Sequence, residues 1–404
     1  MLSNNQKPEE TLIEASKSLR PTVVKQNVME PVMHKILHIV PQFQPGDGIS
    51  SVVMNYAKAI DHARFTFDII THRVDHPSYV NAIQNMGGTV HVLEGFSFGS
   101  LSRLRHWVND FYTRHQEEYD AVHCHMSNAA FLYLREAARV NVPVRILHSH
   151  QTKYADTFSH AIRNMPLIAW GRKYANVNVA CSRQAGRFLF GNQPFIPLPN
   201  AIDTQRFTFN QHDRDEYREN MRLTKDDLLY GNVGRLALQK NQGFLLQAFR
   251  DVRQHNPNAH LIIIGEGPLR TELHQMAQDI GIKDAVIWVD NTSRIDAYYS
   301  AMDAFLLPSL HEGLPVSLIE AQCSGLPCLI AQNIDDQSII LPTIHQLPID
   351  DKSLWSRQMF PMKSSPAHNR LQASHLVSQA GFDMRVQARL LEDIYLSRGF
   401  SSKA

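Results

Sequence analysis

Short apolar runs alternate along the chain with longer amphipathic stretches, and this alternation begins at Lys35. Most runs are apolar throughout and do not alternate with polar residues, as expected for parallel strands that helices cover on both faces. The first group predicts six strands, at residues 36–40, 67–70, 90–93, 121–124, 144–147 and 177–180. Strands separated by helical patterns of this kind predict a doubly wound α/β sheet.

The same rhythm restarts in the second half of the chain. It predicts five further strands, at residues 229–233, 261–264, 286–289, 305–307 and 328–330. Between the two groups lie a proline-rich segment, 195–203, and a charged stretch, 210–220, which we interpret as a linker. The predicted fold is α/β with two Rossmann-like doubly wound parallel sheets facing a cleft, an N-terminal domain at 34–205 and a C-terminal domain at 206–381.

The two ends of the chain differ from its middle. Residues 1–33 are polar, contain three prolines and show no hydrophobic signal core, so they predict a mobile leader. Residues 382–404 open with an acidic residue and helical apolar spacing, which predicts a final helix that could pack back on the N-terminal domain. No apolar run approaches the roughly 18 residues that span a bilayer, so we expect a cytoplasmic protein.

Composition excludes several function classes. The 404 residues carry 40 basic and 39 acidic side chains, a net charge of +1, so the overall balance does not favour nucleic acid as a partner. A hydrophobic content of 43% is enough for two sizeable cores. The four cysteines are scattered and contain no Cys-x-x-Cys pair, which argues against disulfides and structural zinc and favours a reducing compartment.

The segment 311–321 carries the most informative chemistry. Glu312 and Glu320 stand eight positions apart and bracket a Gly-Leu-Pro turn. Pro315 suits the first helical position, and Gly313 permits a close approach just before it. The free N–H groups of that first turn can face a phosphate, with both carboxylates flanking the ligand. An exposed acidic helix start, which the helix dipole favours, explains the same residues equally well.

A second candidate site follows the predicted strand at 229–233. Gly234 and Arg235 come directly after it, and Lys240 follows at a helix start. Ligands of open α/β sheets bind beyond the carboxyl ends of the strands, where this loop and the Glu312 loop would both lie. Two cations there could hold a diphosphate, although solvated surface cations are the alternative interpretation. In the first half, Gly48 could let the backbone approach a ligand, or it could serve only its turn.

Histidine pairs end two of the predicted strands, His123 with His125 and His148 with His150. If the strand continues, His123 and His125 share one face, but two ligands are too few for a metal site. We therefore expect no metal. One histidine of the 148/150 pair is expected to reach a sugar hydroxyl. The Asp-x-Asp spelling at 213–215 lies in the charged stretch without a preceding buried strand, so we interpret it as a helix-start charge cluster.

Taken together, residues 35–400 resemble retaining GT-B glycosyltransferases of family 4, especially the bacterial exopolysaccharide and capsule group. The most specific part runs from 301 to 327 and includes Glu312-Gly313-Leu314-Pro315 and Glu320-Ala321. Next in weight are the segments 234–241 and 145–150. After Asn333 the clear resemblance is lost for roughly fifty residues. Where many relatives have Gly-Gly in the first loop, this chain has Asp47 before Gly48, which places a carboxylate close to the expected phosphates.

The resemblance implies roles for these residues. Glu320 would hydrogen-bond the ribose hydroxyls, and Arg235 with Lys240 would grip the diphosphate. Glu312 and the amides of Gly313 and Leu314 would hold the transferred sugar. The remaining donor contacts would come from the turn glycine Gly234, from Gly48 across the cleft, and from His148 or His150.

The resemblance also implies a reaction. The predicted enzyme is a retaining, metal-independent hexosyltransferase without a cofactor. It would move a sugar from a nucleotide-diphosphate donor, with UDP expected, to a lipid-linked polysaccharide precursor. Its acceptor would be reached by peripheral contact with the inner face of the plasma membrane, and nucleic acid is not expected as a partner. Two alternatives remain, a sugar-nucleotide epimerase of the same architecture and a non-catalytic sugar-nucleotide-binding partner of another transferase.

Overall fold

The computed structural model of the protein describes residues 32–95, 99–151 and 158–397. The chain divides into two units, Met1–Val32 and Met33–Ala404, and the account below concerns the second. The predicted leader therefore lies outside the described residues except at its end, as do residues 398–404 of the predicted terminal segment. The four cysteines are buried free thiols. Within the described ranges, no helix combines the length and the apolar composition needed to cross a membrane.

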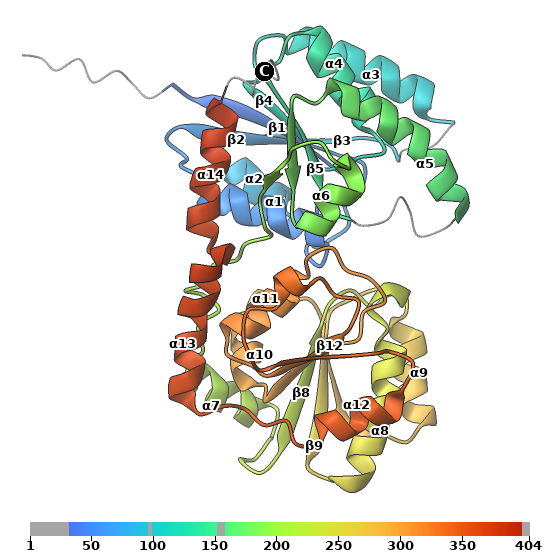
Figure 1. The fold of residues 1–404 in the computed structure, drawn as a ribbon, viewed down its shortest axis with the longest axis vertical. Helices are drawn as coiled ribbons and strands as arrows, with labels where there is room; N and C mark the ends of the chain where they lie inside the picture. The colour runs from blue at the N-terminus through green and yellow to red at the C-terminus, as the bar shows by residue number, and fades with distance from the viewer. Residues whose placement is uncertain (1–31, 96–98, 152–157, 398–404) are drawn as a thin grey trace, which may run out of the picture. The chain divides into compact units, whose positions relative to one another are not determined.

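The first half of the described chain forms a seven-stranded parallel sheet in the order β3-β2-β1-β4-β5-β6-β7 (Figure 1). Its strands are β1 His34–Val40, β2 Phe65–Thr71, β3 Val90–Val92, β4 Ala121–Cys124, β5 Val144–Ser149, β6 Val177–Ala180 and β7 Ile196–Pro197. All six predicted strands are confirmed. The two-residue strand β7 lies in the segment predicted as a linker and forms the sheet edge, where a proline is tolerated because no further strand needs its missing N–H.

Helices cover both faces of this sheet (Figure 1). They are α1 Gly48–Ala59, α2 Val80–Asn85, α3 Leu101–Arg114, α4 Ala130–Arg139, α5 Phe158–Gly171 and α6 Arg183–Phe190. One buried cluster joins α1 and α2 to the sheet, and a second joins α3, α4 and α6 to the opposite face. Helix α1 begins directly after Asp47, which caps it.

The second half forms a six-stranded parallel sheet in the order β10-β9-β8-β11-β12-β13. Its strands are β8 Leu228–Val233, β9 Ala259–Ile264, β10 Val286–Val289, β11 Ala304–Leu307, β12 Cys328–Ala331 and β13 Ile344–Leu347. The five predicted strands are confirmed, and β13 is an addition. The predicted architecture of two Rossmann-like sheets is therefore confirmed.

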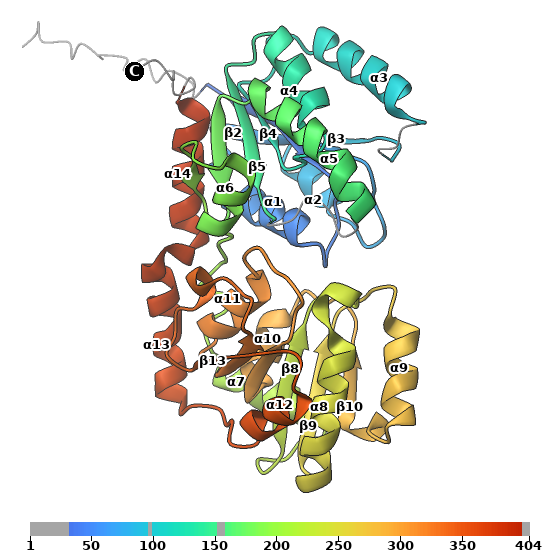
Figure 2. The same ribbon diagram turned by 45° about the vertical axis from the view of Figure 1, so that its right-hand side comes forward.

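Helices also flank the second sheet (Figure 2). They are α7 Gln211–Asn220, α8 Gln242–His255, α9 Arg270–Asp279, α10 Ile295–Ala301, α11 Val316–Cys323, α12 Lys352–Met359 and α13 Ala367–Val377. Short 3-10 turns occupy Arg172–Tyr174, Leu238–Lys240, Lys283–Ala285 and Asp336–Ser338, and a π-helical turn occupies Ser378–Phe382. Two buried clusters hold these helices on the two faces of the sheet.

The charged stretch predicted as a linker is in fact helix α7, so that prediction is wrong. Asn210 caps the helix by accepting hydrogen bonds from two backbone N–H groups. Its arginines point inward, where Arg214 and Arg218 pair with the buried carboxylate of Asp303 at 2.6 and 3.0 Å. Asp213 pairs with Arg294 in the first turn. The Asp-x-Asp sequence is thus a helix-start charge cluster, as predicted.

The last helix, α14 Met384–Leu396, belongs to the core of the first sheet. Its buried residues Met384, Ala388, Leu391, Ile394 and Tyr395 pack with residues of β1 and α1 (Figure 1). A backbone bridge between Ile202 and Asp383 fixes its start. This packing places the Tyr395 hydroxyl beside the central strands β1 and β4.

Candidate functional site

The turn before α11 presents free backbone donors. Pro315 is the N-cap and the helix begins at Val316, one residue later than predicted. No side chain caps this end. In the described part of the chain, nothing accepts a hydrogen bond from the backbone N–H of Gly313 or Leu314. The turn therefore offers amide donors at a helix N-terminus, where a negatively charged ligand is favoured.

Gly313 brings this turn against the loop that follows β5. A Cβ atom at Gly313 would lie 2.2 Å from the carbonyl oxygen of His150, so only glycine fits there. Asn200 reinforces the contact by donating a hydrogen bond to the carbonyl of Leu314 at 3.0 Å. The carboxyl end of β5 and the turn before α11 therefore meet at one place, which brings together candidate residues from both sheets.

Lys240 and Glu312 form an ion pair at 2.6 Å, with their side chains 17% and 8% exposed. Gln239 ties the same two loops together by donating to the carbonyl of His311 at 2.9 Å. From the sequence, Lys240 was predicted to bind the diphosphate and Glu312 the sugar, and no contact between the two side chains was predicted. Their pairing puts both charges at one point beside the free amides of Gly313 and Leu314.

Backbone contacts between glycines shape the loop after β8. Gly234 has a φ of +157°, and Gly265, after β9, has a φ of +140°. A Cβ at Gly265 would lie 2.3 Å from the carbonyl oxygen of Gly234, so the two loops pack backbone to backbone. The sequence analysis did not assign this role to Gly265. The packing presents the exposed Arg235, whose guanidinium has no partner among the described residues.

Arg235 nevertheless lies near the first half of the chain. Hydrogen bonds from Arg73 and Gln44 hold the pKa of Asp75 below its ordinary value, and the charge of Arg235 acts in the same direction. Gly46 likewise meets Asn291, whose amide atoms would lie 3.3 Å from a Cβ at Gly46. These contacts give further evidence that loops at the carboxyl ends of both sheets lie beside one another.

Glu320 carries a carboxylate that no cation pairs within the described ranges. Its Oε2 accepts a hydrogen bond from the buried Tyr299 hydroxyl at 3.0 Å. Burial raises the pKa of Glu320 to about 7, although the Tyr299 bond and the charge of Arg206 oppose the shift. A perturbed carboxyl of this kind is typical of a functional site. Tyr299 was missed by the sequence analysis because nothing in its local pattern shows a partner 21 residues away.

Asp47 and Gly48 begin helix α1. Asp47 is the N-cap, and its Oδ2 accepts hydrogen bonds from the backbone N–H and the hydroxyl of Ser50 at 2.8 and 2.6 Å. Its Oδ1 accepts from Gln42 at 2.6 Å. The carboxylate that departs from the family pattern is therefore occupied in capping the helix. A Cβ at Gly48 would meet nothing within 4 Å, so the fold of the described chain does not itself require glycine there.

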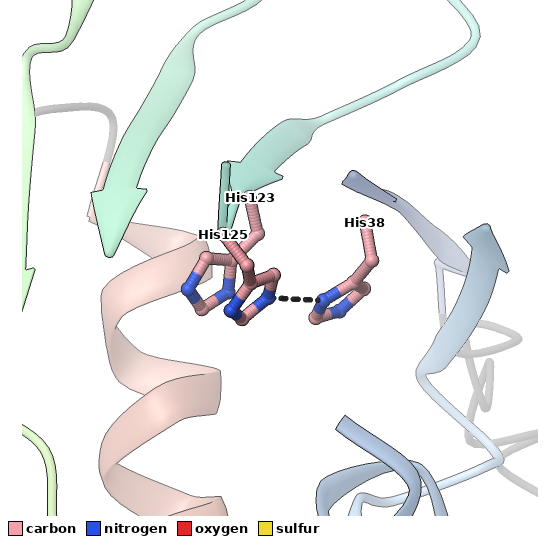
Figure 3. Close-up of side chains that lie close together, drawn as sticks. All are labelled: His38, His123 and His125. Atoms are coloured by element: carbon pink, nitrogen blue, oxygen red, sulfur yellow. Dashed lines mark hydrogen bonds between the residues drawn. The ribbon is translucent and has the colours of Figure 1, made fainter. Parts of the chain in front are cut away.

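The histidines at the ends of β4 and β5 form a network with a fifth histidine. His125 bonds His38 of β1 at 3.1 Å, as Figure 3 shows, and bonds His150 at 2.8 Å. His123 bonds His148 at 3.0 Å. His148 is 1% exposed, whereas His150 is partly exposed, so His150 is the member of the 148/150 pair that a ligand can reach.

This network corrects the expectation that too few imidazoles converge for a metal. Two groups of three histidines each place their ligand atoms within 4.8 Å of one another. One group is His38, His123 and His125, and the other is His125, His148 and His150. Burial lowers the pKa of all five rings, to about 3 for His38 and His150, so the rings are neutral at pH 7 and share the hydrogen bonds described above.

Both halves of the chain match known protein families. Residues 46–206 match the family described as Glycosyltransferase Family 4, and residues 213–338 match Glycosyl transferases group 1. The chain is 29% identical over 377 residues to the putative glycosyltransferase EpsF of Bacillus subtilis, covering 91% of this chain and 97% of EpsF. The chain is a glycosyltransferase.

Solved structures identify the fold of this glycosyltransferase as GT-B. HepE of Anabaena, in complex with UDP and glucose, aligns with a TM-score of 0.74 at 17% identity and covers 90% of this chain and 100% of HepE. The lipopolysaccharide outer core galactosyltransferase WaaB aligns with a TM-score of 0.63 at 15% identity, covering 90% and 99%. The candidate residues Gly48, His148 and His150 fall in the family 4 match, and those from Gly234 to Glu320 fall in the group 1 match.

Proposed function

We propose that this glycosyltransferase moves a hexose from a UDP-sugar to a lipid-linked polysaccharide precursor, with retention and without a metal. The observation that carries the proposal is the unpaired Glu320 carboxylate beside a helix turn with free amides. Its Oε1 is not bonded within the described chain, which suits a ribose hydroxyl donor. A ligand that carries both a diol and an anionic group would match this site, since the carboxylate accepts from the diol and the amides donate to the anion.

The donor would lie along the carboxyl end of the second sheet. Glu320 would accept hydrogen bonds from the ribose, and Arg235 and Lys240 would neutralise the diphosphate. Each charge-assisted hydrogen bond of this kind contributes about 1.5–3 kcal/mol. Glu312 would orient Lys240 through their ion pair and accept from a sugar hydroxyl. The free amides of Gly313 and Leu314 would hold the transferred sugar beside His150.

The reaction would be stabilised mainly by electrostatics. The acceptor hydroxyl oxygen bonds to the anomeric carbon while the bond from that carbon to the β-phosphate oxygen breaks. The hydroxyl proton passes to a phosphate oxygen on the same face, so the products are a retained glycoside and UDP. Negative charge develops on the leaving phosphate, where Lys240, Arg235 and the turn amides would be preorganised to receive it. Cations supplied by the chain make a divalent ion unnecessary in this proposal.

The acceptor class is inferred from relatives and from the surface of the first half. An Escherichia coli relative, 25% identical over 238 residues (56% of this chain and 61% of that protein), is named UDP-Gal:alpha-D-GlcNAc-diphosphoundecaprenol alpha-1,3-galactosyltransferase. Three large apolar side chains of α5 are exposed, Ile162, Met165 and Trp170, at 56%, 48% and 40%. We propose that this face supports peripheral contact with the inner face of the plasma membrane, where a lipid-linked acceptor would lie.

The test is UDP release by the purified full chain. The protein is incubated with a panel of UDP-sugars, each with and without a lipid extract of bacterial membranes, in the presence of EDTA. We expect one UDP-sugar to release UDP only with the lipid extract, and NMR of the product to show the anomeric configuration of the donor. Glu320→Ala should abolish release, whereas Glu272→Ala, which removes an exposed carboxylate of α9, should not. Full activity of Glu320→Ala would refute the site assignment.

A further inference from the structure

Five histidines and one tyrosine form an unbranched hydrogen-bond chain in the first half of the protein. From one end to the other, its members are His148, His123, Tyr395, His38, His125 and His150. The successive N···N or N···O distances are 3.0, 2.9, 3.3, 3.1 and 2.8 Å. Figure 3 shows the His38–His125 link and the neighbouring His123. His38 and His123 stand opposite each other on β1 and β4, and α14 supplies the tyrosine that joins them.

Counting protons leaves only two arrangements for this chain. Burial lowers the pKa of every imidazole in it, so at neutral pH each ring carries one N–H, and the tyrosine carries one O–H. Six protons serve five hydrogen bonds. Each interior ring donates from one nitrogen and accepts at the other. The buried tyrosine hydroxyl has no other acceptor among the described residues, so it donates to one neighbour and accepts from the other, and all bonds run in the same direction. The sixth proton then lies at one end, on His148 Nε2 or on His150 Nδ1.

The two ends differ in their surroundings. His148 is 1% exposed, and its Nε2 has no hydrogen-bond partner among the described residues. A proton there would be a buried N–H without an acceptor, which is rare in proteins, whereas a bare lone pair is better tolerated. His150 is partly exposed, so a ligand can accept a proton from its Nδ1. The favoured direction runs from His148 to His150.

We propose that this chain holds His150 as its Nδ1–H tautomer, because the buried end at His148 Nε2 favours a bare lone pair and Tyr395 of α14 passes that direction on. The part of this proposal that concerns the ligand rests on the function proposed above. His150 is then a hydrogen-bond donor beside Gly313, and it recognises an oxygen acceptor of the sugar nucleotide. Tyr395 is linked to His150 through His38 and His125 and does not itself touch the donor.

Removing the tyrosine hydroxyl should shorten the chain without reversing it. In Tyr395→Phe, the buried His38 Nε2 loses its hydrogen-bond partner and becomes the bare end of the segment from His38 to His150, for the same reason as His148 Nε2 in the natural protein. His150 would therefore keep its Nδ1–H tautomer. Tyr56→Phe is the matched control, because Tyr56 is buried in the same core cluster and its hydroxyl bonds only the carbonyl of Pro199, at 3.4 Å.

The first measurement needs no substrate. Long-range ¹H–¹⁵N correlation spectra of the ¹⁵N-labelled full chain report which ring nitrogen of each neutral histidine carries the proton. His150 is assigned by the loss of its signals in His150→Gln. We expect the Nδ1–H tautomer in the natural protein, in Tyr56→Phe and in Tyr395→Phe, because each leaves a buried bare nitrogen at the end of the chain opposite His150. An Nε2–H tautomer of His150 in the natural protein overturns the proposal, even if no variant folds.

The second measurement separates this inference from the proposed function. Affinity for UDP-glucose, compared with UDP, is measured by calorimetry for the natural protein, His150→Ala and Tyr56→Phe. We expect His150→Ala to lose affinity for UDP-glucose several-fold and to keep its affinity for UDP, with Tyr56→Phe unchanged for both. Equal losses for both ligands, or no loss, overturn the recognition of the sugar by the His150 N–H. If the natural protein binds no UDP-sugar in the panel, the donor assignment fails, while the tautomer result still decides the hydrogen-bond chain.

Discussion

Glu320→Gln removes a charge that is costly to the fold and useful to the proposed donor site. Burial raises the pKa of Glu320 to about 7 from its ordinary value of 4.5. The carboxylate has a hydrogen bond from Tyr299 but no cation partner among the described residues. Glutamine keeps the shape of the side chain and can still accept the Tyr299 bond through its amide oxygen, so the substitution changes mainly the charge.

The sign and size of the effect follow from proton linkage. A carboxyl whose pKa is raised in the folded protein contributes stability that is fully present below pH 4.5 and is lost as the pH rises through 7. Each unit of difference between the folded and unfolded pKa corresponds to about 1.4 kcal/mol. The full loss of folding stability above pH 7 is therefore roughly 3 kcal/mol. Because Glu320 keeps some contact with solvent, we expect about half of this.

Urea denaturation at pH 5 and pH 8, followed by circular dichroism, measures the effect. At pH 8 we expect Glu320→Gln to raise the free energy of unfolding by about 1–3 kcal/mol, and at pH 5 by less than about 1 kcal/mol. The same variant should bind UDP-glucose more weakly at pH 8. Glu272→Gln, an exposed carboxylate of α9, controls for general charge effects. A Glu320→Gln variant that is no more stable at pH 8 than at pH 5, relative to the natural protein, would refute this reasoning.

Three further substitutions test other parts of the site and fold. Lys240→Met should weaken UDP-glucose binding about 10- to 100-fold by calorimetry, as expected for one charge-assisted bond, whereas the exposed control Lys225→Met should not. Asp47→Asn keeps a good N-cap and removes a negative charge, so UDP-glucose should bind a few-fold tighter at unchanged melting temperature; weaker binding would contradict this. Asp303→Asn leaves buried Arg218 unpaired and should cost about 3–5 kcal/mol in urea denaturation, and a loss below 1 kcal/mol would contradict it.

The strands of both sheets could be predicted from the sequence because parallel strands buried on both faces are apolar throughout. The two missed strands lack that signal. Strand β7 is only two residues long and contains Pro197, and β13 carries His345 and Gln346 at an edge of its sheet. Helix α7 was misinterpreted for a different reason. Its arginines appear solvated in the local sequence, and their carboxylate partner, Asp303, stands 85 to 89 residues away.

The candidate site was only partly predictable for a similar reason. The glycines, cations and carboxylates at the carboxyl ends of strands could be identified, since strand ends of a parallel sheet share one edge. Which of these residues contact one another could not be predicted from the sequence. The Lys240–Glu312 pair spans 72 residues, and His38 joins His125 across 87. Such pairings depend on strand order and register, and local patterns contain no information about either.

The polar groups at this edge differ from the buried ion cluster around Asp303. Asp303, deep in the second half, is matched by two arginines, so its charge is balanced within the fold. Among the described residues, Glu320 and Arg235 form no direct ion pair, and the amides of Gly313 and Leu314 have no acceptor. Leaving such groups unmatched lowers stability, and in native proteins unmatched groups cluster at functional sites. These particular groups are therefore available for a ligand to satisfy.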